Sequence, residues 1–324
     1  MKTQPIILFI FIIYCYFVNA ENLVALQVDS TSVSVKTFQY DGVDGSSIFP
    51  GKSIVKIAGA QPFRVSAYEE SFIVSAIKGW DYYVILANGQ DTLLYAIDLQ
   101  TGEIFINGYS PNKQLLYIYG LTYDLKSDQL VAISSMEYDA GEPYFDVVLV
   151  DPNSGEISQN LTIQNSYPNN TWYSGIYTSS QSQSQLYILF QSIDEKTNNT
   201  ISGFTTISTI DGSFVNNVWI NSQNNFVYSF VYDETSSMIL ATMSQYNGKS
   251  LDFISINPTN GDYTVISSDQ VCAGSGPVVI DGVFLSPGKE PKPSHSLSLV
   301  DTNSGKIIKE YFDLFVDISY LSSF

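Results

Sequence analysis

The sequence predicts an all-β protein, a β-propeller built of four-stranded blades, and three observations carry this prediction. A short unit made of an apolar segment, an Asp or Asn, a few turn residues and a Gly recurs along the chain. A second pair of apolar segments precedes each clear copy, so each repeat holds four strand-like segments in about 45–55 residues. β-Branched and aromatic residues dominate these segments, and no long segment carries the period of a helix.

The recurring turn is clearest in residues 147–157, which read Val-Val-Leu-Val-Asp-Pro-Asn-Ser-Gly-Glu-Ile. Asp151 can accept backbone N–H bonds from two residues on, Pro152 fixes the next φ, and Gly155 suits the left-handed position that completes a bulged hairpin. The alternative, that these aspartates bind metal, is not needed, because the turn explains every residue of the motif. Further copies lie at residues 94–104, 253–262 and 297–307, with a shortened version at 207–212.

The segments upstream of the turns come in pairs separated by polar residues. A tyrosine recurs in the first segment of three pairs at nearly equal spacing, as Tyr123, Tyr177 and Tyr232. Two apolar segments before the turn and two around it give the four strands of a propeller blade. The pairs are 120–124 with 130–133, 175–177 with 186–189, and 229–233 with 238–241.

Six blades are expected, in one domain that spans residues 21–324. The two ends of the chain supply the last blade: residues 23–29 resemble a third strand with its Asp, and residues 312–321 resemble a first strand. Closing the ring in this way leaves no free sheet edge. Seven blades is the alternative, because residues 39–70 are hard to place. The five legible units are 71–108, 115–163, 171–216, 226–267 and 276–311.

At residues 94–104 the sequence resembles the repeats of quinoprotein-like propellers. Residues 147–157 and 297–307 are similar to the extracellular propellers named for a Tyr-Val-Thr-Asn motif. The resemblance covers most of the chain and implies the fold. It does not imply the cofactor, because quinone enzymes of that class carry adjacent cysteines and conjugating tryptophans, whereas here Phe105 follows the turn and Cys272 has no partner.

The N-terminus predicts export. Lys2 precedes an apolar run at residues 6–18, and Val18-Asn19-Ala20 offers the small residues that signal cleavage prefers, so residues 1–20 read as a signal peptide and the mature chain begins at Glu21. An uncleaved anchor is the alternative, although the run is shorter than the roughly 20 residues that span a bilayer. No later stretch is apolar enough to span. We expect a secreted, extracellular protein.

Two further features fit the secretory route. Acceptor sequons begin at Asn160, Asn169 and Asn198, and each is a predicted N-glycosylation site. Cys15 lies within the signal, so Cys272 has no partner for an internal disulfide. A buried, inert thiol is expected there, with an intermolecular bridge as the alternative.

Charge excludes one class of partner. The chain has 14 Lys and Arg against 32 Asp and Glu, a formal net charge of −18. Such a chain repels phosphate backbones, so nucleic acid is not expected as a partner.

The catalytic groups of common hydrolases are scarce. His295 is the only histidine and lies in a Pro-rich loop, where a solvated surface residue is expected rather than the base of a Ser-His-Asp triad. A zinc site of the usual kind needs several His or Cys ligands and is therefore not expected. Arg64 is the only arginine, which removes chemistry that rests on an arginine cluster. No catalytic residue and no cofactor is predicted. The alternative is a hydrolase of lactonase, esterase or glycosidase type, in which carboxylates from several blades converge on calcium or work as a pair.

The loops between second and third strands gather at one mouth of a propeller. In the second legible unit, Tyr138, Asp139 and Glu142 lie in such a loop, and Tyr beside carboxylates suits a sugar or a basic protein surface. We therefore expect these three residues to bind ligand. The function predicted from the sequence is a non-catalytic binding or interaction module for an extracellular protein or carbohydrate.

Overall fold

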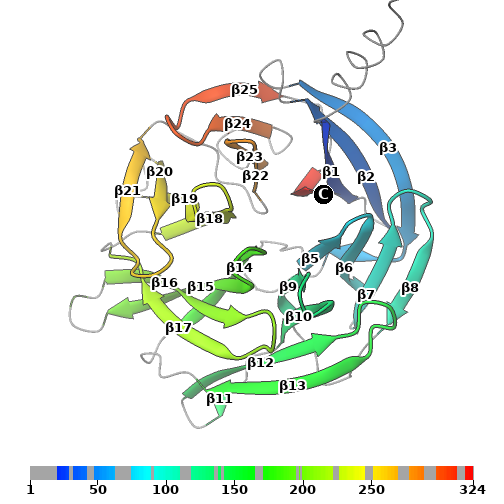
Figure 1. The fold of residues 1–324 in the computed structure, drawn as a ribbon, viewed down its shortest axis with the longest axis horizontal. Coiled ribbons are helices and arrows are strands. Elements are labelled where there is room, and N and C mark those ends of the chain that lie inside the picture. The colour runs from blue at the N-terminus through cyan, green and yellow to red at the C-terminus, as the bar shows by residue number, and fades with distance from the viewer. Residues whose placement is uncertain are drawn as a thin grey trace, which may run out of the picture.

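The structure is a computed structural model, in which the described residues form six antiparallel sheets arranged as the blades of a β-propeller (Figure 1). No helix occurs among the described residues. The predicted fold class and the six-blade count are therefore confirmed. The described residues are 20–28, 32–41, 47–62, 74–88, 91–109, 118–134, 138–139, 142–164, 171–194, 197, 199–221, 226–244, 251–268, 277–287, 297–311 and 318–323.

Each blade is an antiparallel sheet whose first strand lies nearest the axis of the ring (Figure 1). Blade 1 contains β26 (Ile318–Ser323), β1 (Ala20–Val28), β2 (Ser32–Asp41) and β3 (Ser47–Ala58). In blade 2, β4 (Gln61–Pro62) and β5 (Val74–Lys78) both pair with β6 (Asp81–Asn88), followed by β7 (Asp91–Asp98) and β8 (Ile104–Tyr109). Blade 3 contains β9 (Ile118–Asp124), β10 (Gln129–Ser134), β12 (Glu142–Val150) and β13 (Ile157–Gln164), with β11 (Tyr138–Asp139) paired on β12.

The remaining blades repeat this order in the second half of the chain. Blade 4 contains β14 (Trp172–Ser180), β15 (Gln185–Asp194), β16 (Asn199–Ser208) and β17 (Phe214–Trp219). Blade 5 contains β18 (Phe226–Asp233), β19 (Met238–Ser244), β20 (Leu251–Ile256) and β21 (Tyr263–Ser267). Blade 6 contains β22 (Val278–Ile280), β23 (Val283–Pro287), β24 (Leu297–Asp301) and β25 (Ile307–Tyr311).

The two ends of the chain close the ring, as the sequence predicts. The C-terminal strand β26 pairs antiparallel with β1, with Ser323 opposite Leu23 and Ile318 opposite Gln27. The pairing makes β1 the second strand of blade 1, so the prediction that residues 23–29 supply the third strand is wrong. Residues 47–58 form the outer strand of the same blade, so the region that suggested a seventh blade completes the first.

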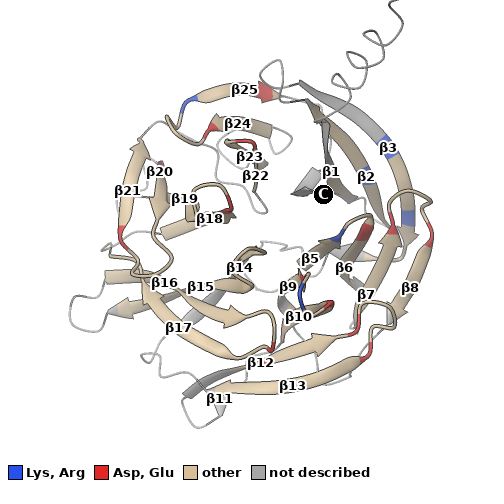
Figure 2. Cartoon of the chain, viewed as in Figure 1, with Lys and Arg blue, Asp and Glu red and all other residues tan. Residues whose placement is uncertain are grey.

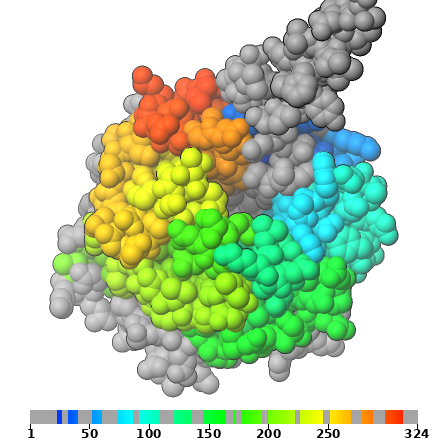
Figure 3. Space-filling view, viewed as in Figure 1, coloured from blue at the N-terminus to red at the C-terminus, as the bar shows by residue number. Residues whose placement is uncertain are grey.

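Apolar side chains fill the space between neighbouring blades. One buried cluster joins Tyr83 and Ile85 of blade 2 to Leu121 and Leu130 of blade 3. Aromatic rings do the same elsewhere: Tyr187 and Tyr232 stack between blades 4 and 5, and the rings of Phe253 and Phe284 lie 5.0 Å apart between blades 5 and 6. In the space-filling view, the blades coloured cyan to orange pack directly against one another (Figure 3).

The predicted turn is confirmed in atomic detail. Asp151 Oδ1 accepts the backbone N–H of Asn153 at 2.7 Å and of Ser154 at 3.1 Å. Gly155 has φ 75° and donates its N–H to the Asp151 carbonyl at 2.8 Å. The sequence suggested that the copy at 207–212 is shortened, and this prediction is wrong. Ser208 takes the place of Asp and accepts the N–H of Gly212, whose φ is 72°.

Because strands alternate in direction, the connections of each blade lie at two ends. Those from first to second strand and from third to fourth lie on one side of the ring, here called the hairpin side. Those from second to third strand and from one blade to the next lie on the other, here called the loop side. The 1–2 hairpins at residues 125–128, 181–184 and 234–237 have equal length. The loop-side connections differ in length, as those at 89–90, 110–117 and 268–277 do.

Candidate functional site

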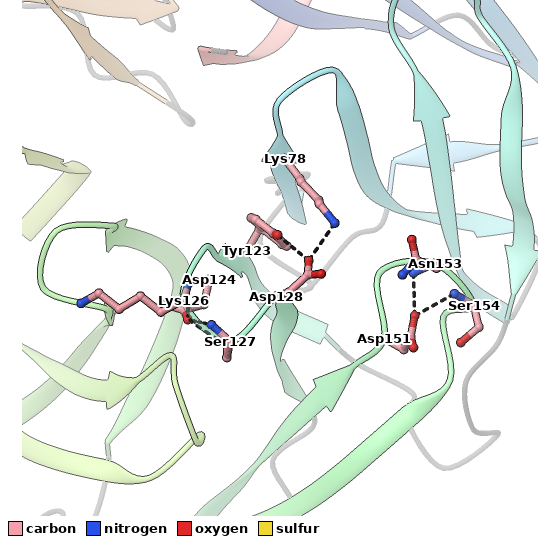
Figure 4. A network of polar contacts seen from close by, with 9 residues as sticks. All are labelled: Lys78, Tyr123, Asp124, Lys126, Ser127, Asp128, Asp151, Asn153 and Ser154. Carbon is pink, nitrogen blue, oxygen red and sulfur yellow. Dashed lines mark hydrogen bonds and ion pairs between the residues drawn. The ribbon is translucent and has the colours of Figure 1, made fainter.

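An ion pair joins the hairpins of blades 2 and 3 (Figure 4). Lys78 Nζ lies 2.7 Å from Asp128 Oδ1, and the Tyr123 hydroxyl donates to the same oxygen at 2.5 Å. Lys78 also lies over the Tyr123 ring, 5.2 Å from its centroid. The hydrogen bonds from Lys78 and Tyr123 lower the pKa of Asp128, and the bond to Asp128 raises the pKa of Lys78. The interaction ties two blades together.

A buried carboxylate joins blades 3 and 4. Asp124 is 1% exposed, and its Oδ1 accepts the hydroxyl of Thr209 at 2.7 Å. Its Oδ2 accepts both the backbone N–H and the hydroxyl of Ser127 at 2.8 Å. Burial alone raises the pKa of Asp124, but the hydrogen bonds from Thr209 and Ser127 outweigh it and the pKa is lowered. The charged form is therefore the one that the fold stabilises.

A third contact continues the series to blade 5. Glu234 Oε1 accepts the backbone N–H of Gln181 at 2.6 Å, and its Oε2 accepts the hydroxyl of Ser182 at 2.5 Å. Gln181 Nε2 donates in turn to the Tyr123 carbonyl at 2.6 Å. The 1–2 hairpins of blades 2 to 5 are thus linked, each to the one in the next blade. Sequence reasoning did not identify this network; its signal was the repeated Tyr-Asp pair that ends β9 and β18.

Tyr177 is not equivalent to Tyr123 and Tyr232, in spite of the even spacing. Tyr123 and Tyr232 are each the last residue but one of their strands, β9 and β18, and lie opposite Leu130 and Ile239. Tyr177 lies two residues earlier in β14 than that position, opposite Ile188. Its hydroxyl accepts the N–H of Ser75 at 2.8 Å and donates to the Ser75 carbonyl at 2.9 Å, and burial raises the pKa of Tyr177 to about 12. This half-buried side chain therefore bridges blades 2 and 4.

Asp and Glu residues recur at turns of the chain (Figure 2). Most of those with described contacts hold backbone N–H groups of their own turn, as Asp98 holds those of Gln100 and Thr101. Within the described ranges, no group of three or more His, Cys, Asp or Glu side chains could hold a metal ion. The polar contacts described on the hairpin side stabilise the ring.

The predicted ligand-binding residues lie between the second and third strands of blade 3, on the loop side. Tyr138 and Asp139 form β11, and Glu142 is the first residue of β12. Asp139 lies opposite Glu142, and Tyr138 opposite Pro143. The connection is therefore a small paired hairpin that extends the third strand. Binding by these three residues stays a prediction.

The other sequence predictions fall partly within the described chain. Asn160 is exposed on β13, and the hydroxyl of Thr162, which completes its sequon, donates to Asp146 Oδ1 at 2.7 Å. Among the described residues, no helix is long and apolar enough to cross a membrane. The predictions for Asn169, Asn198, Cys272, His295 and Arg64 lie outside the described residues.

Neither a family model nor a curated protein matches the sequence. Solved structures do match the fold. TolB from Acinetobacter baumannii is 10% identical, with a TM-score of 0.59 over 96% of this chain and 69% of that chain. The Hadza microbial sialidase Hz136 is 8% identical, with a TM-score of 0.50 over 89% of this chain and 68% of that one. At these identities the likeness shows the fold alone: the chain is a six-bladed β-propeller.

The buried carboxylate on the hairpin side predicts a pH dependence. The pKa of Asp124 is lower in the folded chain than in the unfolded one, so its charge stabilises the fold above about pH 4 and this contribution is lost as the pH falls through the folded pKa. We expect Asp124→Asn to lower the free energy of unfolding by about 1–3 kcal/mol at pH 7. The difference from wild type should shrink at pH 3.

Urea denaturation at the two pH values measures both effects. Thr209→Ser, which keeps the donor hydroxyl, is the control and should follow the wild-type profile. A loss of the same size at pH 7 and pH 3 would show that the charge of Asp124 does not stabilise the fold.

Proposed function

We propose that this propeller is a secreted glycoprotein that acts as a non-catalytic binding module, with an extracellular protein or carbohydrate bound on the loop side. The observation that carries the proposal is the difference between the two sides of the ring. The described hairpin side is built of short turns joined by hydrogen bonds, whereas the loop-side connections differ in length from blade to blade. Variable loops on a rigid scaffold are where proteins place recognition.

The hairpin of β11 and β12 supports blade 3 as part of the binding surface. Its backbone pairing sets Asp139 opposite Glu142 beside Tyr138, at the start of a strand whose residues 147–150 are buried in the blade. A tyrosine next to two carboxylates offers an amphipathic ring together with hydrogen-bond acceptors. This chemistry suits a sugar or a protein surface that carries donors.

Two features support the secretory route. Residues 1–20 have the composition of a cleaved signal. Asn160 lies on the outermost strand of blade 3 with an exposed side chain, so a glycan attached there would project away from the ring. A glycan on an edge strand would also hinder pairing with another chain.

Replacing Tyr138, Asp139 and Glu142 together by Ala should weaken partner binding at least tenfold. The free energy of unfolding should change by less than about 0.5 kcal/mol, because β11 is two residues long and pairs only with the first residues of β12. The partner is first captured from extracellular fluid on the immobilised protein and identified, and affinity and denaturation are then measured with purified components.

The matched control is Asp151→Ala, on the hairpin side. It removes two backbone hydrogen bonds and should lower the free energy of unfolding by about 1 kcal/mol while leaving affinity unchanged. If the triple variant binds the partner normally, and Asp151→Ala abolishes binding while the protein stays folded, the ligand binds on the hairpin side instead.

The secretory proposal is tested on protein from a eukaryotic secreting host. We expect the mature chain to begin at Glu21 and its mass to fall on treatment with an N-glycosidase. Asn160→Gln should remove one glycan from the mass spectrum, because the native side chain is exposed. An intracellular product that keeps residues 1–20 and shows no mass shift would contradict the proposal.

A further inference from the structure

Two aromatic side chains are exposed on the strand of blade 5 that lies nearest the axis. Phe226 is 39% exposed and Tyr228 is 44% exposed, and their ring centroids lie 6.4 Å apart. They belong to β18, the first strand of its blade (Figure 1). By register, Phe226 lies on the face of blade 5 that also carries Leu240, which is buried with Phe284 of blade 6.

The pair lies on the loop side. Phe226 is the first residue of β18 and lies opposite Ser244, the last residue of β19, after which the chain enters the connection between second and third strands. The opposite end of β18, at Asp233, meets Met238 across the hairpin. The aromatic pair and the hairpin of β11 and β12 therefore lie on the same side of the ring.

A β-bulge accounts for the exposure. Val227 pairs with Met243 and Ser229 with Thr242, which leaves Tyr228 without a partner in the register. The bulge reverses the alternation of faces, so Phe226 and Tyr228 are exposed while Phe230, two residues on, is buried. Bulges re-aim side chains and are frequent next to functional sites.

The two strand ends that carry the aromatic pair favour an uncharged ligand. Neither β18 from Phe226 to Ser229 nor β19 from Ala241 to Ser244 contains a charged residue. The polar groups behind the rings are neutral and buried: the Ser229 and Thr242 hydroxyls bond to each other at 2.7 Å, and Ser244 lies opposite Phe226. A charged segment would gain no ion pair from these strand ends, whereas a sugar ring has C–H faces for the aromatic rings.

We infer that Phe226 and Tyr228 form a stacking platform for a neutral oligosaccharide on the loop side of the ring. The inference rests on the proposed function and names its ligand class. Each ring offers a large, rigid contact area, and the tilt of 39° between the rings suits successive units of a chain better than one flat ligand.

Isothermal titration calorimetry tests the platform with maltohexaose, cellohexaose, chitohexaose and mannohexaose as probes. At least one should bind the full chain, and Phe226→Ala/Tyr228→Ala should weaken that binding at least tenfold. Tyr228→Phe, which keeps the ring, should bind as wild type does. The matched control is Phe105→Ala/Phe214→Ala, because these rings are 39% and 43% exposed but lie on the outer strands β8 and β17. It should leave affinity unchanged.

Hexalysine is added as a charged probe. Three results would overturn the inference: no saccharide binds, a saccharide binds all variants alike, or hexalysine binds the wild-type chain and binds the Phe226→Ala/Tyr228→Ala variant less tightly. The last result would mark a basic peptide as the ligand and leave the proposed binding function standing. If no saccharide binds while a captured protein partner is lost from the Tyr138, Asp139 and Glu142 variant, only the saccharide inference fails. If that variant also binds normally, the proposed function fails with it.

Discussion

The contact between the 3–4 hairpin of one blade and the outer strand of the blade before it depends on a glycine. A Cβ on Gly261 would lie 1.9 Å from the Trp219 carbonyl oxygen, and one on Gly305 would lie 2.3 Å from Ser267 Cβ. Both glycines also hold a left-handed backbone, with φ 75° and 67°. One residue type thus satisfies the turn and the approach of the next blade. A similar close approach recurs at Gly102 and Gly212, so it sets the spacing of blades around the ring.

Polar contacts reinforce this packing on the same side. The pair of Lys78 with Asp128 and the bond from Thr209 to Asp124 each join neighbouring blades, and the pairing of β1 with β26 completes the circle. Since the hairpin side holds the ring together, the loop side is free to differ between blades. The paired hairpin of blade 3 and the bulged start of β18 are two such differences.

The repeats made the blade count predictable, because each copy contains its own turn chemistry. The position of a strand within its blade was harder to predict. Residues 23–28 form an apolar strand of the common type, and only pairing with the distant β26 makes it the second strand. One complete copy of the turn was missed because Ser208 stands where the other copies have Asp or Asn, and Asp211 beside Gly212 suggests a shorter turn. Backbone geometry, not residue identity, defines the motif there.

The exposure of Phe226 and Tyr228 could not be predicted from the sequence for a similar reason. Phe226, Tyr228, Phe230 and Tyr232 alternate with other residues, which predicts that all four share one face. The bulge at Tyr228 divides them into an exposed and a buried pair, and no local residue pattern marks its position. The repeated Tyr-Asp pair marks the strand ends at which the network of Asp124 and Glu234 begins. Its partners could not be predicted, because they come from hairpins more than 50 residues away.

Urea unfolding of Gly261→Ala beside Gly59→Ala tests most directly whether close approach at the hairpins holds the blades in place. Gly59 has φ 77°, and a Cβ added there would meet no atom within 4 Å, so its substitution carries only the cost of the left-handed backbone, about 1 kcal/mol. Gly261→Ala adds the clash with the Trp219 carbonyl, and we expect a loss of about 3 kcal/mol. Equal losses in the two variants would show that close approach at the hairpin does not hold neighbouring blades in place.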